Sequence, residues 1–291
     1  MTEDAKTAVV LGANSLVAPY LVRQLVELGY SGHLLGRNRP VGGVSEFPWA
    51  AFDIENPGDW QAPAGALIFC LAPLLLLPPL MPRMTGAHHV VALSSTSTLA
   101  YARSDDPREA GLSRSLLDAE GRVLAAAKSA GLRCTILRPT MIYGRGQDLN
   151  ISKIILFVDR FGFFPLAAPG RGLRQPVHAD DVAAASVAAA FSPSAREKIY
   201  EIGGGETLTF REMVQSALKQ AGRPSRIVAL PAGLLRFGAR LAGWILPHAN
   251  AAGMIARMNQ DQAFDFEDAR KAFGYTPRAF LLDPEDVPRR A

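Results

Sequence analysis

The chain has 291 residues, of which 48% are hydrophobic and 20% are charged, and its formal net charge is +4. This composition is typical of a folded globular protein with a sizeable core, and it argues against a disordered chain. The positive charge comes from scattered arginines, and no basic stripe alternates with aromatic residues. We therefore expect no nucleic-acid partner.

Membrane and secretion signals are weak. The longest apolar run, residues 66–81, is shorter than a membrane span and contains three prolines. The first residues, MTEDAK, lack the apolar core of a signal peptide. The two cysteines, Cys70 and Cys134, fall in expected strands, so we predict buried free thiols in a reducing compartment. A cytoplasmic protein without a membrane span is the expectation.

Short apolar runs alternate with helical patterns through the first half of the chain. Strands are predicted at 7–12, 32–36, 48–54, 66–72, 89–95 and 132–139, and helices at 16–29 and 116–131. Strands that are apolar nearly throughout and separated by helices indicate a parallel sheet covered on both faces. The sequence therefore predicts an α/β fold with a doubly wound parallel sheet of the Rossmann type.

The pattern changes after about residue 145. A short strand and a helix capped by Asp180 or Asp181 are predicted within 171–191, followed by a strand at 198–204, a helix at 207–222 capped by Thr207 or Thr209, and a helix around 232–246. We interpret residues 1–145 as a dinucleotide-binding domain to which 176–204 returns. The smaller C-terminal substrate lobe would then contain 146–175 and 205–291.

The loop after the first strand, in VVLGANSLVAPYLVRQL (9–25), has the position of a dinucleotide loop. Gly12 would permit the tight turn, and Ala18 would let the helix pack closely on the strand. Ser15 stands where a glycine usually lets the backbone approach the pyrophosphate. The alternative is a plain strand–helix turn with Asn14 or Ser15 as the N-cap.

The ends of the second and third strands carry further candidates. Gly36, Arg37 and Asn38 follow the second strand, where an NAD-preferring site would offer a carboxylate to the ribose hydroxyls. The guanidinium of Arg37 suits a 2′-phosphate instead, so NADP is preferred over NAD; a solvated loop charge is the alternative. Asp53 and Ile54 end the third strand, close to where adenine would lie.

Other polar and amphipathic features have simpler interpretations. His88 and His89 precede a strand and have no third ligand at metal spacing, so we expect exposed loop histidines and no metal site. His178 lies beside two acids that are better explained as helix caps. Residues 231–247 form an amphipathic pattern, which predicts a lobe helix packed on the body or on a partner, with a membrane-surface helix as the alternative.

Taken together, eight segments in order resemble the extended short-chain dehydrogenase/reductase family, especially its nucleotide-sugar epimerase and dehydratase branch. They are LGANSLVA (11–18), FDIENP (52–57), LAP (71–73), LSSTS (93–97), LRPTMIYG (137–144), RQPVHADDVA (174–183), YEIGGGETLTFREM (200–213) and FDFEDARKAFGYTPRAF (264–280). The resemblance covers nearly the whole chain. It implies a Rossmann-type NAD(P)-binding fold and an epimerase, dehydratase or oxidoreductase activity.

The resemblance also implies roles for individual residues. Along the cofactor it places Gly12, Asn14, Ser15, Leu16, Gly36, Arg37, Asn38, Asp53, Ile54, Leu71, Ala72, Pro73, Ser94, Pro139 and Met141. Where the substrate lobe meets the main domain, it places the substrate-binding candidates Asn150, Arg174 and His178. Thr96 matches the catalytic serine or threonine that hydrogen-bonds the substrate oxygen.

The chain departs from the family at the acid–base pair. The family's catalytic tyrosine and lysine lie four residues apart, and alignment on Glu120 places Leu112 and Leu116 at their positions. A phenol with a lowered pKa exchanges a proton with the substrate, and a nearby ammonium lowers that pKa. Two leucines can do neither. Tyr101 and Tyr143 are the only nearby phenols that could substitute.

Two functions remain open at this point. The first is an NAD(P)-binding protein of the nucleotide-sugar epimerase, dehydratase or reductase type, weak or atypical in catalysis. The alternative is a non-catalytic NADP(H)-binding sensor or assembly subunit. The candidate partners are a small-molecule substrate, with a nucleotide-linked sugar foremost, and a second copy of the chain in a homodimer.

Overall fold

A computed structural model describes residues 6–40, 46–102, 104–235, 237 and 251–289. The chain divides into two compact units, each made of three segments. Unit 1 contains Met1–Pro139, Ala179–Ile202 and Asp265–Thr276, and unit 2 contains Thr140–His178, Gly203–Phe264 and Pro277–Ala291. Among the described residues, no helix has the length and apolarity needed to cross a membrane.

Unit 1 is built on a seven-stranded sheet in the order β11-β6-β5-β4-β1-β2-β3, in which every neighbouring pair is parallel. Its strands are β1 (Thr7–Leu11), β2 (Ser31–Gly36), β3 (Trp49–Ala51), β4 (Leu67–Cys70), β5 (His89–Leu93), β6 (Arg133–Pro139) and β11 (Lys198–Ile202). The chain winds outward from β1 to β3 and then crosses back to β4. This order confirms the predicted doubly wound fold.

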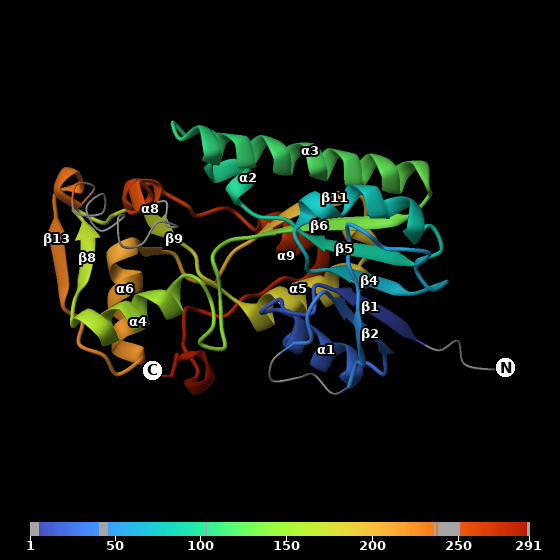
Figure 1. Ribbon diagram of the computed structural model, residues 1–291, viewed down its shortest axis with the longest axis horizontal. Coiled ribbons are helices and arrows are strands. Elements are labelled where there is room, and N and C mark those ends of the chain that lie inside the picture. The colour runs from blue at the N-terminus through green and yellow to red at the C-terminus, as the bar shows by residue number, and fades with distance from the viewer. Residues whose placement is uncertain (1–5, 41–45, 103, 236, 238–250, 290–291) are drawn as a thin grey trace. The chain divides into compact units, whose positions relative to one another are not determined.

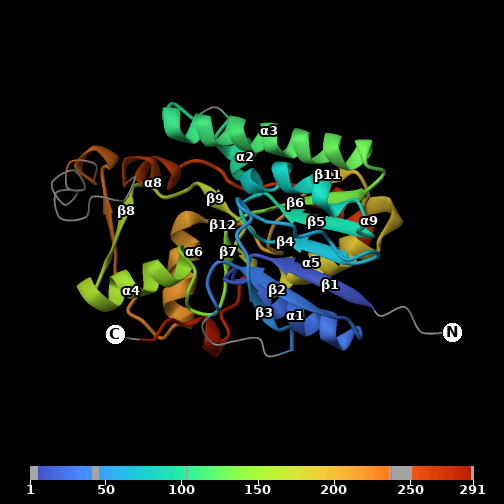
Figure 2. The same ribbon diagram turned by 45° about the vertical axis from the view of Figure 1, so that its right-hand side comes forward.

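Helices cover both faces of this sheet. The helices of unit 1 are α1 (Ala18–Glu27), α2 (Ser97–Ala100), α3 (Pro107–Ser129), α5 (Ala179–Phe191) and α9 (Glu267–Phe273). Figures 1 and 2 show α3 along one face and the neighbouring helices α1 and α5 on the other. Between β4 and β5 the chain forms the 3₁₀ turns η1 (Leu74–Leu76) and η2 (Pro78–Met84), because closely spaced prolines prevent a regular α-helix there.

The core under α3 is apolar and contains both thiols. Cys70 and Cys134 are free and fully buried, as predicted. Burial raises the pKa of each thiol to about 12, since a thiolate would lose its hydration there. Neither thiol is therefore a nucleophile near neutral pH.

A buried ion-pair network joins α3 to two strands. The Arg138 guanidinium donates to Glu120 Oε2 at 2.5 Å and to Glu120 Oε1 at 2.9 Å, and also to Glu201 Oε1 at 2.9 Å. Ser94 Oγ donates to Glu120 Oε1 at 2.5 Å. Because these partners lie on β6, α3, β11 and the end of β5, the network fixes the helix to the sheet through charge-assisted bonds.

Unit 2 consists of short paired strands and helices. Its strand pairs are β7 (Ile142–Tyr143) with β10 (Val177–His178), β9 (Leu173–Arg174) with β12 (Leu208–Thr209), and β8 (Phe164–Ala167) with β13 (Ile227–Leu230). Its helices include α4 (Ile151–Phe161), α6 (Phe210–Gln220) and α8 (Ala251–Arg257). Thr209 is the N-cap of α6 and forms a capping box with Glu212, which agrees with one of the two predicted caps.

Several predicted boundaries differ from the structure. Helix α3 begins at Pro107, well before residue 116, because the Asp106 side chain caps it by accepting from the Arg108 amide at 2.9 Å. Helix α5 begins at Ala179, so Asp180 lies in its first turn and does not precede it as a cap. The helix predicted around 232–246 falls largely outside the described residues.

The division into units also differs from the predicted domains. Residues 140–145 and 176–178 belong to unit 2, and 265–276 belong to unit 1. The last segment contains α9, whose Phe273 stacks edge-on against Tyr200 of β11 at a centroid distance of 5.2 Å. The Ser192 hydroxyl also donates to the Ala272 carbonyl at 2.6 Å. These contacts explain why this segment returns to the sheet.

Glu120→Gln should lower the free energy of unfolding by about 3 kcal/mol, because it leaves the buried Arg138 without its main counter-charge. Asp118→Asn on the same helix is the matched control, since its pair with Arg122 is exposed and spans 3.7 Å. It should change stability by less than about 0.5 kcal/mol. Urea unfolding followed by circular dichroism measures both. Equal losses in the two variants would contradict the role of the network.

Candidate functional site

The loop after β1 is closely packed at the point where the strand order reverses. Gly12 has φ +103°, and a Cβ added to it would lie 2.7 Å from the Ala72 amide nitrogen and 2.8 Å from the Leu71 carbonyl carbon. The amides of Gly12 and Ala13 both donate to the Leu35 carbonyl, at 2.9 and 3.1 Å. A glycine is therefore required at this position by both conformation and space. Ligands of doubly wound sheets bind at this crevice, beyond the carboxyl ends of the strands.

The turn into α1 is held by polar side chains. The side-chain amide of Asn14 donates through Nδ2 to the Asn38 carbonyl at 2.9 Å, which ties the loop after β1 to the loop after β2. Ser15 Oγ accepts from the Val17 amide at 3.3 Å. Val17 is the N-cap of α1, so neither Asn14 nor Ser15 takes the N-cap position of the alternative interpretation. The Ser15 hydroxyl keeps its proton available for a phosphate oxygen.

The ends of β2 and β3 bring Arg37 and Asp53 into electrostatic contact. Gly36 packs against Ala13, since a Cβ there would lie 2.9 Å from the Ala13 Cβ, and Arg37 beyond it is exposed. Hydrogen bonds from the Asn56 side chain and the Glu55 amide lower the pKa of Asp53, and the positive charge of Arg37 contributes. Asp53 is thus an anion near neutral pH beside the cation that the sequence assigns to the ribose.

The ends of β4 and β5 complete the predicted cofactor edge. Leu71, Ala72 and Pro73 follow β4, and the Leu71 amide donates to the Leu11 carbonyl at 2.8 Å. After β5, Thr96 is buried, and its amide and hydroxyl both donate to the Pro139 carbonyl, at 3.1 and 3.2 Å. Of the predicted cofactor residues, Met141 alone belongs to unit 2.

Ser94 is engaged by the buried network described above. Its hydroxyl donates to Glu120, so Ser94 is oriented by a carboxylate that is itself held by Arg138. Glu120 served only to align the acid–base positions in the sequence, and no role was predicted for Glu120 or Arg138. A carboxylate among the apolar positions of an amphipathic helix is the signal that could have identified a buried pair.

The two leucines at the acid–base positions differ in exposure. Leu112 is 41% exposed on α3, whereas Leu116 is 8% exposed and belongs to the apolar core under that helix. Tyr101 ends the short helix α2 in unit 1. Tyr143 lies in unit 2, is fully buried, and donates to the Leu281 carbonyl at 2.9 Å. Its hydroxyl proton is therefore already engaged in a structural hydrogen bond.

The three predicted substrate residues all lie in unit 2. Asn150 is exposed at the N-cap of α4. Arg174 is buried: its guanidinium lies 5.3 Å from the Phe210 ring and donates to main-chain carbonyls, those of Leu173, Arg257 and Gln260. Arg174 therefore holds main chain together within the unit, and Asn150 alone of the three is exposed.

His178 belongs to a compact polar group with Asp283 and Asp286, whose ligand-type atoms lie within 4.8 Å of one another. His178 Nε2 lies 3.3 Å from Asp286, and the amides of Arg145 and Asp283 donate to Asp286 at 2.7 and 2.9 Å. Burial alone would raise the pKa of Asp286, but these hydrogen bonds hold it below its ordinary value. The group joins the C-terminal segment to β7 and β10.

The histidine prediction was half wrong. His88 is exposed as expected, but His89 is buried at the start of β5. Its Nδ1 lies 3.0 Å from the Ala190 carbonyl and its Nε2 lies 2.9 Å from Thr135 Oγ1. Burial, together with neighbouring positive charges, lowers the pKa of His89 to about 4, so the ring is neutral. It is a satisfied core histidine.

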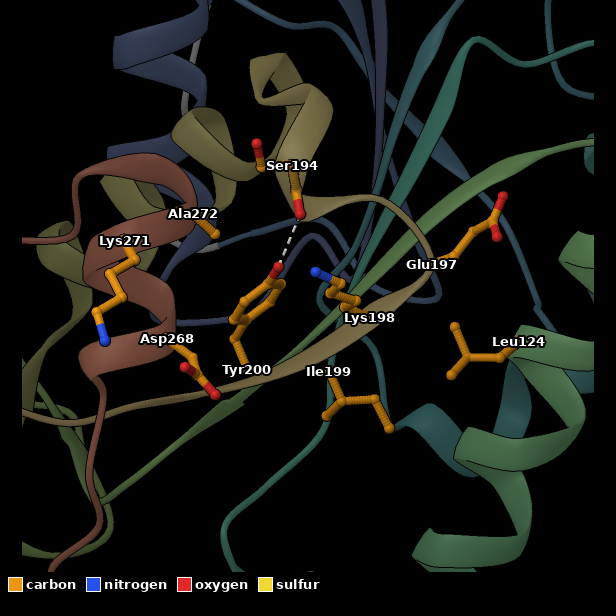
Figure 3. A pocket seen from close by; sticks show the side chains of 9 residues that line it. All are labelled: Leu124, Ser194, Glu197, Lys198, Ile199, Tyr200, Asp268, Lys271 and Ala272. Atoms are coloured by element: carbon orange, nitrogen blue, oxygen red, sulfur yellow. Dashed lines mark hydrogen bonds between the residues drawn. The ribbon is translucent and has the colours of Figure 1, made fainter.

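A hollow of about 620 Å³ lies along the edge strand β11 (Figure 3). It is lined by Leu124 of α3, Ser194, Glu197, Lys198, Ile199, Tyr200, and the α9 residues Asp268, Lys271 and Ala272. The Tyr200 hydroxyl donates to the Ser194 carbonyl at 3.0 Å. None of the residues assigned to cofactor or substrate lines this hollow, so it is separate from the predicted site.

Comparison with known proteins identifies related sequences. The model of the NAD dependent epimerase/dehydratase family matches residues 84–203. An uncharacterised protein of Sinorhizobium fredii, y4nG, is 29% identical over 201 residues, which are 67% of this chain and 50% of the relative. The mitochondrial NADH dehydrogenase (ubiquinone) 1 alpha subcomplex subunit 9 of Arabidopsis thaliana is 36% identical over 115 residues, which are 38% of this chain and 28% of the relative. The chain thus spans half or less of the length of these two relatives.

Comparison with solved structures gives the same fold. MoeE5 in complex with UDP-glucuronic acid and NAD superposes with a TM-score of 0.71 over 95% of each chain, at 22% sequence identity. This match confirms the predicted Rossmann-type architecture. The family model supports the resemblance to epimerases and dehydratases over residues 84–203.

Gly12→Ala and Gly29→Ala separate the two reasons for a glycine after β1. Both positions have positive φ, but a Cβ at Gly29 meets nothing within 4 Å. Gly29→Ala should cost about 1–2 kcal/mol of stability from the left-handed conformation alone. Gly12→Ala should cost about 2 kcal/mol more, because its Cβ would overlap main chain. Thermal and urea unfolding compare them, and equal losses would contradict the close approach.

Proposed function

Because the chain is a relative of the NAD dependent epimerase/dehydratase family, whose model covers residues 84–203, we propose that unit 1 binds a nicotinamide dinucleotide. One observation carries the proposal: Gly12 brings the loop after β1 into main-chain contact with the residues after β4, at the reversal of the strand order. In doubly wound sheets the pyrophosphate lies at this crevice, against the N-terminus of the first helix. The Ser15 hydroxyl would donate to it.

The charge beyond β2 favours NADP over NAD. Arg37 is exposed at the place where an NAD site offers a carboxylate to the ribose hydroxyls. Its planar guanidinium can bind a 2′-phosphate through two parallel hydrogen bonds. The charge of Arg37 lowers the pKa of Asp53, so the two side chains lie near each other. In this proposal they would both border the adenosine of the cofactor.

For the substrate we propose a polar, nucleotide-linked sugar, because MoeE5, which shares the fold, is described with UDP-glucuronic acid and NAD. The bound nicotinamide would supply a hydride acceptor or donor. Thr96 would orient the substrate oxygen, although its hydroxyl now donates to the Pro139 carbonyl and would have to rotate. The cytoplasmic location expected from the sequence stays a prediction.

Proton transfer is the weak step of this proposal. Leu112 and Leu116 cannot exchange a proton, and the Tyr143 hydroxyl is engaged within unit 2. A positioned acid–base typically contributes about 10²–10⁴-fold in rate, so its absence should slow turnover by a similar factor. Tyr101 is the phenol in unit 1 closest in sequence to Thr96 and is the first substitute to test.

A non-catalytic subunit is the second candidate function. The two leucines favour it, because a protein that only holds a cofactor has no need of an acid–base pair. Similarity to an NADH dehydrogenase subunit over 115 residues gives independent support. In this alternative the cofactor would stabilise unit 1 and the chain would act through a partner. A homodimer stays a prediction.

Calorimetric titration with NADPH and NADH tests the cofactor proposal. The unmodified protein should bind NADPH more tightly, and Arg37→Asp should weaken NADPH binding by about 1.5–3 kcal/mol, the contribution of a charge-assisted contact. Arg39→Asp, two residues further along the same exposed loop, is the matched control and should retain most of the affinity. Tighter NADH binding would overturn the NADP preference, and no binding of either would overturn the cofactor site.

Turnover assays separate the two functions. Conversion of UDP- and dTDP-sugars should be very slow in the unmodified protein, as measured by chromatography of the sugar products together with the absorbance of NADPH. Leu112→Tyr with Leu116→Lys should raise the rate if a substrate pocket is present, whereas Leu112→Tyr with Leu117→Lys should not, since it lacks the four-residue spacing. Rapid turnover by the unmodified protein, abolished by Tyr101→Phe, would show that another phenol carries the proton. Cofactor binding without turnover in every variant would favour the subunit.

A further inference from the structure

Three basic residues lie at the amino-terminal ends of adjacent strands of the sheet in unit 1. His88 precedes β5, Arg133 begins β6, and Arg196 precedes β11. His89 pairs with Arg133, and Lys198 pairs with Thr135, so the three basic residues lie at nearly the same level of the sheet. Neighbouring strands are about 4.8 Å apart. The predicted cofactor residues follow the carboxyl ends of the strands, so this group lies at the opposite ends of the strands.

The first contact in this group joins two basic side chains directly. Arg133 Nη1 lies 2.9 Å from His88 Nε2. A guanidinium only donates hydrogen bonds, so His88 Nε2 must accept and the imidazole must be neutral. Partial burial and the positive charges of Arg133 and Arg196 lower the pKa of His88, which keeps it in that form near neutral pH. His88 therefore orients Arg133 without neutralising it.

Among the described residues, no carboxylate forms an ion pair with either guanidinium group. Within the described part of the chain, the ion pairs include neither Arg133 nor Arg196. The nearest acid in sequence is Glu197, whose side chain lines the hollow along β11. The charges that act on His88 and His89 in this region are all positive. Two guanidinium groups on neighbouring strands therefore lack an ion-pair partner among the described residues.

Arg196 also has an unsatisfied donor. Its Nε is buried and has no hydrogen-bond partner. An unpaired buried donor typically costs about 1–3 kcal/mol, and more when it is charged, so such a group in a folded protein requires an explanation. An anion accepting from this Nε–H would satisfy it, and Arg133 begins the neighbouring strand β6.

We propose that His88, Arg133 and Arg196 form a binding site for a small oxyanion of the phosphate class. Two guanidinium groups offer planar pairs of donors that match the oxygens of phosphate. His88 holds one of them in place, and the buried Nε of Arg196 supplies a directed donor. The site is independent of the proposed cofactor site, because one lies at the amino-terminal ends of the strands and the other at their carboxyl ends.

Isothermal titration of the full chain with inorganic phosphate, at constant ionic strength and with NADPH present at saturation, tests this site. Saturable binding with one phosphate per chain is expected. Arg133→Gln and Arg196→Gln should each weaken it at least tenfold. Arg122→Gln is the matched control, because Arg122 is an exposed arginine in unit 1 with an acidic partner, and it should leave binding unchanged. Absence of saturable binding, or equal loss in Arg122→Gln, would overturn the proposal.

A measurement on the unmodified protein guards against variants that fold poorly. The imidazole resonances of His88, assigned by comparison with His88→Gln, should shift with increasing phosphate and saturate at the calorimetric dissociation constant. His33, an exposed histidine of β2 in the same unit, should not shift. Loss of the phosphate effect on adding NADPH would show that phosphate had occupied the cofactor groove, and would contradict a separate site.

Discussion

The architecture of unit 1 depends on one close approach of main chain to main chain. Gly12 leaves β1 in a left-handed conformation directly against the residues that leave β4, with no space for a Cβ between them. That contact sets where α1 begins and how near the loops after β1, β2 and β4 come to one another. The cross-link from Asn14 to the Asn38 carbonyl extends the same constraint to the loop that carries Arg37. The predicted cofactor site at this end of the sheet therefore depends on main-chain packing between these loops.

The structure separates stability from acid–base chemistry on the same helix. Helix α3 is fixed by Glu120, which Arg138 and Ser94 bind from the sheet, while Leu116 one turn earlier packs into the core. On the predicted alignment, the fold thus keeps the ion pair that holds this helix and has leucines where the proton-transferring pair is expected. Both candidate functions are compatible with a retained scaffold that lacks the acid–base pair. They differ in whether another group donates the proton.

The sequence predicted the sheet of unit 1 well because each strand is a compact apolar run bounded by turn residues. It also gave Thr209 as one of two possible caps of α6, and the structure selects Thr209, which forms a capping box with Glu212. It placed the start of α3 late, because the first turns of that helix are polar and the signal at Asp106 and Pro107 was overlooked. His89 was misjudged because its partners, the Ala190 carbonyl and Thr135, come from distant parts of the chain. The unpaired state of Arg196 is likewise a tertiary property that no local pattern reveals.

Both units are assembled from three separated stretches of chain, and this has a consequence for how the protein is made. Tyr200 of the outer strand β11 can contact Phe273 only after all of residues 203–264 have left the ribosome. Unit 2 in turn is completed only when the final segment has been synthesised, because Asp286 in that segment contacts His178. Such late, long-range closure raises contact order and leaves the outer strand without its α9 contacts during synthesis. Nascent chains that stop before residue 265 would therefore present β11 to other chains, and a holding chaperone would be most useful to this protein in that interval.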